Sequence, residues 1–182
     1  GKRLASAAGA VLCTHFGVSG PAILDISRHW LVARATDAEA HVVVNWWPGE
    51  RPESLDRMLL DLGRGSAGRG LARRLPERLA RALCAEAGVD AAAPASSLTR
   101  EQRRRLAGLV TEMRLPVTGD RGWSHAEVTA GGVPLSEVHL ESLESRAQPG
   151  LHLAGEILDV DGRLGGFNFQ WAWASGHAAG EA

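Results

Sequence analysis

The sequence contains 182 residues, 45% of them hydrophobic and 23% charged, which is ordinary for a globular protein that buries a core without disulfides or a structural metal. The formal net charge of −1 gives no electrostatic reason to expect nucleic acid or an anionic membrane as a partner. Cys13 and Cys84 are the only cysteines, so we expect no disulfide framework and a cytoplasmic location. No apolar run reaches the roughly 18–20 residues that span a bilayer, and the opening residues do not match a signal peptide. Because the first residue is not methionine, we expect a piece of a longer protein.

Residues 1–48 are predicted to form strands around one helix. Short apolar runs bounded by turn residues occupy positions 10–13 and 41–44, which is typical of strands. Pro21 follows serine and glycine at a position suited to the first turn of a helix. A helix is therefore expected to begin there.

Residues 49–115 are predicted to be helical. Leucine and methionine recur at helical spacing in two stretches, 55–62 and 71–83. Thr99 and Gln102 form a capping-box pattern that predicts the start of a further helix.

Arginine is concentrated in this helical zone. We interpret the arginines as the solvated outer faces of helices, with docking of RNA, phosphate or an acidic protein as the alternative. Binding of that kind would weaken steeply with salt. The residues are Arg64, Arg69, Arg73, Arg74, Arg78, Arg81, Arg100, Arg103, Arg104 and Arg105.

Three motif matches are set aside. Residues 63–68 fit the dinucleotide fingerprint G-x-G-x-x-G, but the preceding segment has helical periodicity where the fingerprint needs a strand. Cys13 and His15 have no second pair at metal-ligand spacing, so no metal site is expected. Ser19 lacks the glycine spacing of a hydrolase nucleophile elbow.

The end of the chain carries the most chemical information. Residues 150–155 are predicted to form a buried strand that ends in glycine, and residues 167–179 a helix rich in small residues. Glycine lets a ligand approach the backbone, and Glu156 could accept hydrogen bonds from sugar or ribityl hydroxyls. A helix N-terminus near Gly166 suits a negatively charged ligand edge, which in a flavoenzyme is the N1/O2 side of the isoalloxazine. On composition alone, a plain glycine-rich connection is an equal alternative.

Four segments, in order, resemble the BaiN-like family of bacterial NAD(P)/FAD-dependent flavoproteins. They are THFGVSGP at 14–21, VTAGGV at 128–133, GLHLAGEILDVDG at 150–162 and GGFNFQWAW at 165–173. The resemblance spans nearly the whole chain, and the last motif is long and specific.

The resemblance implies an α+β fold in which an insert interrupts an α/β Rossmann-like FAD domain. The insert would be a strand-rich, barrel-like part formed by residues 1–48 and by return strands at 116–128. A helical subdomain would occupy residues 49–115. Residues 129–182 would be the C-terminal part of the FAD-binding domain.

The resemblance also implies which residues meet the cofactor. Thr14 and His15 would face the flavin ring from the insert, and His15 is the best candidate for catalysis, although a structural histidine is the stronger interpretation. The residues implied near FAD are Thr129, Ala130, Gly131, Gly155, Glu156, Asp161, Gly162, Gly165, Gly166, Phe167 and Asn168.

By the same resemblance, the chain is part of an oxidoreductase that passes hydride from NAD(P)H through FAD to an organic small-molecule substrate. The glycine-rich loop that would cradle the pyrophosphate is missing from this sequence, so we expect the chain alone to bind FAD weakly and to be inactive. Its main partner would be the missing N-terminal nucleotide-binding half. The alternative is a non-catalytic module that binds RNA or an acidic partner through its arginine-rich helices.

Overall fold

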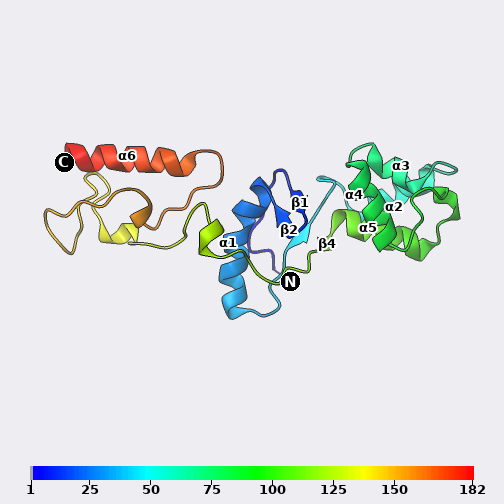
Figure 1. The fold of residues 1–182 in the computed structure, drawn as a ribbon, viewed down its shortest axis with the longest axis horizontal. Coiled ribbons are helices and arrows are strands. Elements are labelled where there is room, and N and C mark those ends of the chain that lie inside the picture. Colours follow the sequence, from blue (N-terminus) through cyan, green and yellow to red (C-terminus); the bar gives the residue numbers. More distant parts are fainter. Residues whose placement is uncertain (1) are drawn as a thin grey trace. The chain divides into compact units, whose positions relative to one another are not determined.

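The computed structural model describes residues 2–182, which form two compact units (Figure 1). Residues 41–118 make one unit, and the chain on either side of them makes the other. Among the described residues, none of the helices is both long enough and apolar enough to cross a membrane.

The unit of residues 41–118 is built on helices. They are α2 (Pro52–Asp61), α3 (Ala67–Ala72), α4 (Glu77–Glu86), the 3-10 turn η1 (Ala95–Ser97) and α5 (Arg100–Thr111). The short strands β3 (Val43–Val44) and β4 (Met113–Arg114) pair antiparallel, with Val43 opposite Arg114. The chain therefore enters and leaves the helical unit side by side.

Leucines from all four helices form the core of this unit. Leu59, Leu71 and Leu106 are fully buried, and Leu55 and Leu83 are nearly so. Burying a side chain of this size contributes about 1.5–3 kcal/mol. The helical spacing seen in the sequence therefore marks the faces that hold the helices together.

The capping box at the start of α5 is confirmed. The Thr99 hydroxyl accepts a hydrogen bond from the Gln102 amide at 3.2 Å, and the Gln102 side chain accepts one from the Thr99 amide at 3.0 Å. The stretch at 71–83 differs from a single helix, because it is divided between α3 and α4 with Pro76 at the N-cap of α4. Proline disfavours helical backbone in the residue before it, and so ends the continuity.

The glycines of residues 63–70 serve packing. Helix α2 precedes them, so the strand that a dinucleotide fingerprint requires is absent from this described segment. A Cβ atom on Gly68 would lie 2.7 Å from the Ala91 carbonyl oxygen, and one on Gly70 would lie 2.4 Å from a Leu62 methyl carbon. The fingerprint match is therefore fortuitous, as the sequence indicated.

The second unit begins with a hairpin and a helix. Strands β1 (Leu12–Thr14) and β2 (Gly17–Ser19) pair antiparallel, and α1 (Pro21–Thr36) follows with Pro21 in its first turn. After residue 118 this unit contains the 3-10 turns η2 (Trp123–His125), η3 (Leu135–Glu137) and η4 (Gly155–Ile157), and then α6 (Phe167–Glu181). The helices predicted to start near 21 and 167 are thus confirmed.

Three strand predictions are not met by the structure. Residues 116–128 were expected to form return strands, but the one element assigned there is the 3-10 turn η2. A barrel-like insert is not confirmed, because the strands assigned in residues 2–182 form only two separate two-stranded sheets. Residues 150–155 were expected to be a buried strand but are irregular, and Leu151 is 45% exposed. A strand needs hydrogen-bonded neighbours, and this segment makes one isolated bridge, from His152 to Glu144.

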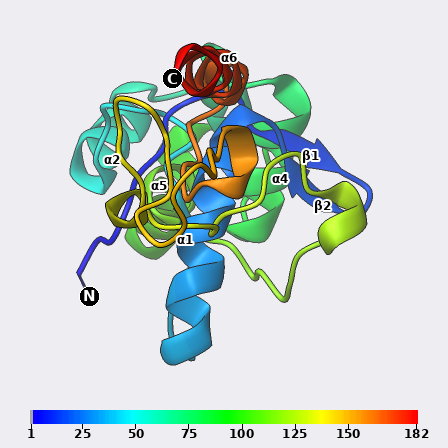
Figure 2. The same cartoon turned by 90° about the vertical axis from the view of Figure 1, so that its left-hand side faces the viewer.

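Helix α6 covers a small apolar core. Val138, Leu143 and Leu158 are buried there, and Trp171 and Ala178 of α6 pack against them. In Figures 1 and 2 the helix lies along the irregular 130–160 segment. The small side chains of Ala178 and Ala179 leave room for this close approach.

Candidate functional site

Two segments far apart in the sequence run side by side at the centre of the site. The Val133 amide donates to the Ile157 carbonyl at 2.8 Å, and the Asp159 amide donates to the Val133 carbonyl at 2.9 Å. The bridge between Val133 and Leu158 is parallel, the strand direction typical of α/β domains. Gly132 has a φ of 139° and no room for a Cβ, which would lie 2.5 Å from the Ile157 carbonyl oxygen. Glycine at this position therefore allows the close approach.

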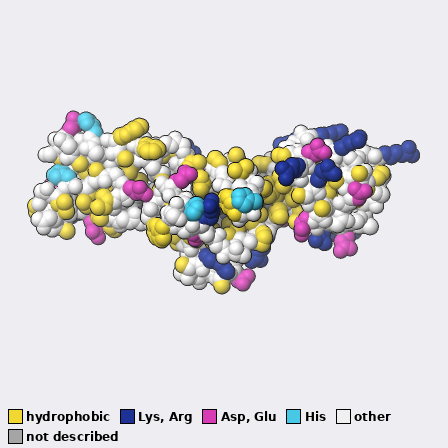
Figure 3. Space-filling model, in the orientation of Figure 1, with side chains coloured by type: hydrophobic (Ala, Val, Ile, Leu, Met, Phe, Trp, Pro, Cys, Tyr) yellow, Lys and Arg dark blue, Asp and Glu magenta, His cyan; other side chains and the backbone are white. Residues whose placement is uncertain are grey.

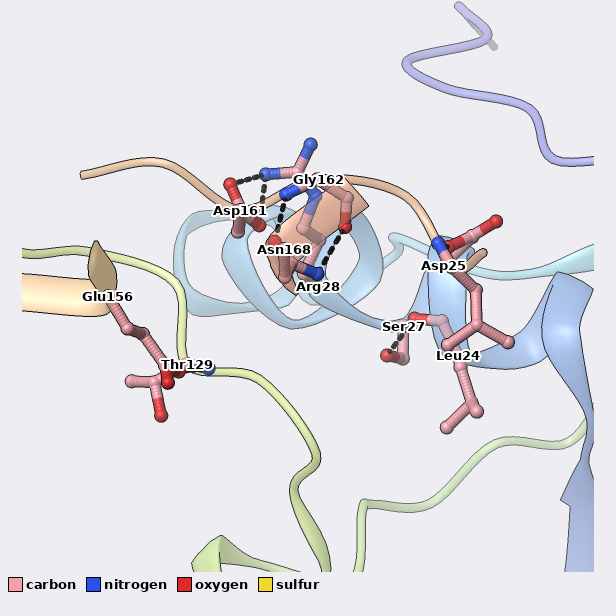
Figure 4. Close-up of polar contacts among 10 residues, drawn as sticks. Leu24, Asp25, Ser27, Arg28, Thr129, Glu156, Asp161, Gly162 and Asn168 are labelled. Atoms are coloured by element: carbon pink, nitrogen blue, oxygen red, sulfur yellow. Dashed lines mark hydrogen bonds and ion pairs between the residues drawn. The ribbon is translucent and has the colours of Figure 1, made fainter. Parts of the chain in front are cut away.

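This approach brings Thr129 and Glu156 together. The Thr129 amide donates a hydrogen bond to one carboxylate oxygen of Glu156 at 2.7 Å (Figure 4). The predicted ribityl-side acid thus has one oxygen engaged in joining two backbone segments. Its other oxygen makes no hydrogen bond within the described chain and could accept a ligand hydroxyl.

Gly155 is held by two side chains of α6. Its amide donates to the Ser175 hydroxyl at 2.9 Å, and its carbonyl accepts from the Trp171 indole at 3.1 Å. Ser175 is buried and also donates to the Trp171 carbonyl at 2.6 Å. With φ at 76°, Gly155 has the left-handed backbone that turns the chain from the 150–154 segment into η4.

The turn from 159 to 166 is closed by Asn168. Its side-chain oxygen accepts from the Gly162 amide at 2.6 Å, and its side-chain amide donates to the Gly162 carbonyl at 3.1 Å (Figure 4). A Cβ on Gly162 would lie 2.9 Å from that of Phe167. Both the glycine and the asparagine are therefore needed for this turn to fold back onto α6.

The first turn of helix α6 has no side-chain cap. Its N-cap, Gly166, adopts left-handed backbone with φ at 88°, and no side chain caps the first amides. No acidic residue lies in the first turn, and the Arg163 guanidinium lies 4.6 Å from the centre of the Phe167 ring. Unpaired amides and the positive end of the helix dipole favour a negatively charged or acceptor-rich ligand.

Two side chains of helix α1 also bind the turn at 159–166. Nη1 of Arg28 contacts both carboxylate oxygens of Asp161 (Figure 4). Asp25 accepts a hydrogen bond from the Leu164 amide at 2.7 Å. Asp25 and Arg28 are three residues apart, so they lie on one face of α1. The turn is thus fixed at Asp161 and at Leu164.

The sequence model of a family described as "HI0933-like protein Rossmann domain" matches residues 4–182. The match includes the α1 contacts, the paired 131–133 and 157–159 segments and the start of α6. This chain belongs to the HI0933-like family. The resemblance to the BaiN-like family is confirmed by this match and by a relative that is named as a reductase.

Curated relatives of this HI0933-like chain fall under two names. It is 36% identical over 177 residues to a ribosomal RNA dihydrouridine synthase of Escherichia coli, covering 94% of this chain and 41% of that protein. It is 33% identical over 171 residues to the protein of the same name from Haemophilus influenzae, covering 92% and 40%. It is also 33% identical over 183 residues to a 3-dehydro-bile acid delta(4,6)-reductase of Clostridium scindens, covering 98% and 45%. The chain therefore spans less than half the length of each relative.

The structure brings together most of the residues predicted near FAD. Thr129 and Glu156 are bonded, Gly155 is fixed by α6, and the segment from Asp161 to Asn168 forms one turn. Gly131 is next to the tightly packed Gly132 and has φ at 98° with open space around its α carbon. Ala130 lies between this glycine and Thr129, and no contact gives it a role of its own.

His15 lies outside this group. It is exposed at the turn between β1 and β2, where its ring meets the ring of Phe16 edge-on at 5.1 Å. Thr14 donates to the Gly17 carbonyl at 3.0 Å and so stabilises the hairpin. In the part of the chain that the structure describes, no bond joins His15 to the turn at 159–166.

Several residues of the site were not foreseen from the sequence. Asp25, Arg28, Trp171 and Ser175 hold the predicted residues in place. Trp171 lies within the GGFNFQWAW motif, so the motif indicated that this part of the chain belongs to the site. Nothing in the sequence near Arg28 indicates a partner among residues 160–169.

The residues present fit the ring side of a flavin. Adding a Cβ to Gly131, Gly155 or Gly166 would meet nothing within 4 Å, so the backbone is open to a ligand at these three points. The uncapped start of α6 suits the N1/O2 edge, which becomes anionic on reduction. Among residues 2–182 there is no group of three or more potential metal ligands.

Proposed function

We propose that this chain is the ring-side part of an FAD-dependent reductase. The observation that carries the proposal is the uncapped N-terminus of α6, preceded by Gly165 and Gly166 and held in place by Asn168. FAD, when bound, supplies hydride transfer from NAD(P)H to the substrate. The remaining segments of the site bind the cofactor and orient it.

Each residue has a physical task in this proposal. The first amides of α6 offset negative charge on the ring edge. Glu156 joins the Thr129 segment to the η4 turn and offers its second oxygen to the ribityl chain. His15, exposed on the β1–β2 hairpin, is the residue that we assign to proton transfer at the substrate, because an imidazole can both accept and donate a proton.

The reaction class follows from the names of the relatives. Dihydrouridine is uridine with two hydrogens added across a carbon–carbon double bond, and the name of the bile acid enzyme likewise describes reduction of double bonds in a 3-oxo compound. In both cases the double bond is conjugated with a carbonyl group. We infer that the present protein also reduces an activated carbon–carbon double bond.

The nucleotide half of FAD would be held by residues beyond this chain, since the chain covers 41%, 40% and 45% of its relatives. The isolated chain is therefore expected to be colourless and to ignore added FAD. The full-length protein is expected to be yellow.

The test is a visible absorption spectrum of the purified full-length protein, followed by anaerobic addition of NADH and, separately, NADPH. We expect flavin absorption that is bleached by at least one nicotinamide and restored by an enone substrate. A colourless full-length protein that takes up no FAD would overturn the proposal. In that case the alternative, a non-catalytic binding module, would be favoured by salt-sensitive RNA binding without flavin.

A further inference from the structure

The net charge of −1 conceals a strong division of charge along the chain. Residues 41–118 contain 13 arginines and nine acidic residues, a net charge of +4. The remaining residues contain seven basic and 12 acidic side chains, a net charge of −5. Lys2 is the only lysine in the sequence, so the two units differ in the number of their arginines and not in a preference for arginine over lysine.

Most of this positive charge lies on α3, α4 and their flanking turns. Residues 62–85 contain one acidic residue, Glu77, and six arginines. We call these six the arginine surface: Arg64, Arg69, Arg73, Arg74, Arg78 and Arg81. All six are exposed, and Figure 3 shows basic side chains gathered over α3 and α4.

Packing explains why the arginines point outward. Leu71, Leu75 and Leu83 of the same segment are buried in the helical core, which leaves the intervening positions in solvent. Arg81 pairs with Glu77 at 3.8 Å, and Arg74 pairs with Glu50 at 3.8 Å. Within the described chain, the other four arginines make no ion pair, so their charge is available to a ligand.

The composition of the arginine surface decides what kind of ligand fits. No large apolar side chain of residues 62–85 is exposed. A protein partner would need apolar or aromatic anchors at the centre of its interface, and stable anchoring to a membrane takes a second, apolar signal beside a basic patch. Charge without such anchors fits a regular array of phosphates.

We infer that the arginine surface binds the phosphate backbone of the RNA that the enzyme reduces. The inference rests on the proposed function, because it assigns RNA as the substrate class of that reductase. Two curated relatives are named as acting on ribosomal RNA, and the charge division gives this chain a surface of the required sign. The rest of the chain, at −5, repels phosphate, so RNA is attracted to the helical unit and not to the chain as a whole.

The surface has no exposed aromatic ring on which a base could stack. It therefore positions the RNA without reading its sequence, since phosphate contacts carry no base information. Binding should fall steeply with salt, by a slope of about 0.7–0.9 in log Kd against log salt concentration for each phosphate neutralised.

The test uses full-length protein and a fluorescein-labelled RNA hairpin of arbitrary sequence, with Kd measured by anisotropy between about 50 and 200 mM NaCl. The variant is R69Q/R73Q/R78Q, and the matched control is K2Q/R3Q/R34Q, which removes the same number of exposed charges from the other unit. We expect the variant to bind RNA on the order of tenfold or more weakly, with a salt slope lower by about 2–3, and the control to match wild type. Thermal unfolding should be similar for all three proteins, because the substituted side chains are exposed.

Equal RNA affinity and salt slope in variant and wild type would overturn the inference. So would a polyglutamate competitor that displaces the hairpin as well as unlabelled RNA does, because the surface would then be suited to an acidic protein. Flavin content and bleaching by NAD(P)H are read on the same samples. Wild-type protein that contains no flavin and is not bleached by NAD(P)H would overturn the proposed function. The RNA affinities of variant and control would still decide whether the arginine surface binds phosphate.

Discussion

Arg28 and Asp161 are 133 positions apart in the sequence, and one guanidinium nitrogen of Arg28 contacts both carboxylate oxygens of Asp161. One turn earlier on α1, Asp25 binds the Leu164 amide. A helix that follows the N-terminal hairpin thus holds the turn that leads into α6. Helix α1 and the proposed flavin-binding turn are structurally coupled through these two contacts.

Replacing Arg28 with alanine should affect the cofactor more than the fold. The Arg28 side chain is 45% exposed, so solvent screening limits the contribution of the ion pair to stability to about 1 kcal/mol or less. Loss of the contact frees the turn, and we expect the full-length protein to bind FAD a few-fold more weakly. Titration of apoprotein with FAD measures this, with R34A on the same helix as control. Equal FAD affinity in R28A and R34A would contradict the proposed coupling.

Asn168→Ala should open the turn at Gly162. The substitution removes two hydrogen bonds of a partly buried side chain, at 2.6 and 3.1 Å, which together contribute about 1–3 kcal/mol. We expect a lower unfolding temperature and loss of flavin on gel filtration of the full-length protein. Q170A, an exposed substitution on the same helix, is the control. If N168A and Q170A retained flavin equally, Asn168 would have no role in holding the turn.

Gly132→Ala should be among the most damaging single substitutions in this unit. The new Cβ would lie 2.5 Å from the Ile157 carbonyl oxygen and 3.0 Å from the Leu158 carbonyl carbon. The φ of 139° at this position is also unfavourable for alanine. We expect a loss of about 3 kcal/mol or more in unfolding free energy, measured by chemical denaturation. Gly150→Ala is the control that measures the cost of a positive φ alone, because Gly150 also has positive φ but has open space around it. A loss in G132A no larger than that in G150A would show that the two segments are not in close contact.

The two cysteines should differ in reactivity. Cys13 is exposed, whereas burial, and to a smaller extent the nearby Asp90 carboxylate, raise the pKa of the Cys84 thiol. Iodoacetamide, followed by peptide mass spectrometry, should label Cys13 and spare Cys84 until denaturant is added, because the thiolate is the nucleophile. The stability associated with the neutral Cys84 thiol is present below its unfolded pKa and is lost as pH rises through the higher folded pKa. Rapid labelling of Cys84 in the folded protein would contradict its burial.

Local signals in the sequence predicted the helix starts. Pro21 marks the first turn of α1, and the pair Thr99 and Gln102 caps α5, because proline and capping side chains act within one turn of the backbone. The glycine-rich motif before Phe167 likewise precedes α6. These features depend on neighbouring residues alone and can be read without a fold.

Contacts between distant segments could not be predicted in the same way. The partner of Arg28 is set by the folding of the chain, and no spacing rule connects it with Asp161. The apolar run at 150–155 has the composition of a strand, but strand formation depends on neighbours, and the described chain provides it with one bridge. Hydrophobic periodicity also could not show that Pro76 divides the 71–83 stretch while its leucines stay in one core.

The most direct test of the central claim is an experimental structure of the full-length protein with FAD bound, in which the distance from the N1/O2 edge of the isoalloxazine to the first backbone amides of α6 is measured. We expect a hydrogen-bond distance of about 2.7–3.2 Å to the amides of residues 167–168, with Glu156 beside the ribityl chain. An isoalloxazine bound elsewhere, with the start of α6 open to solvent, would contradict it.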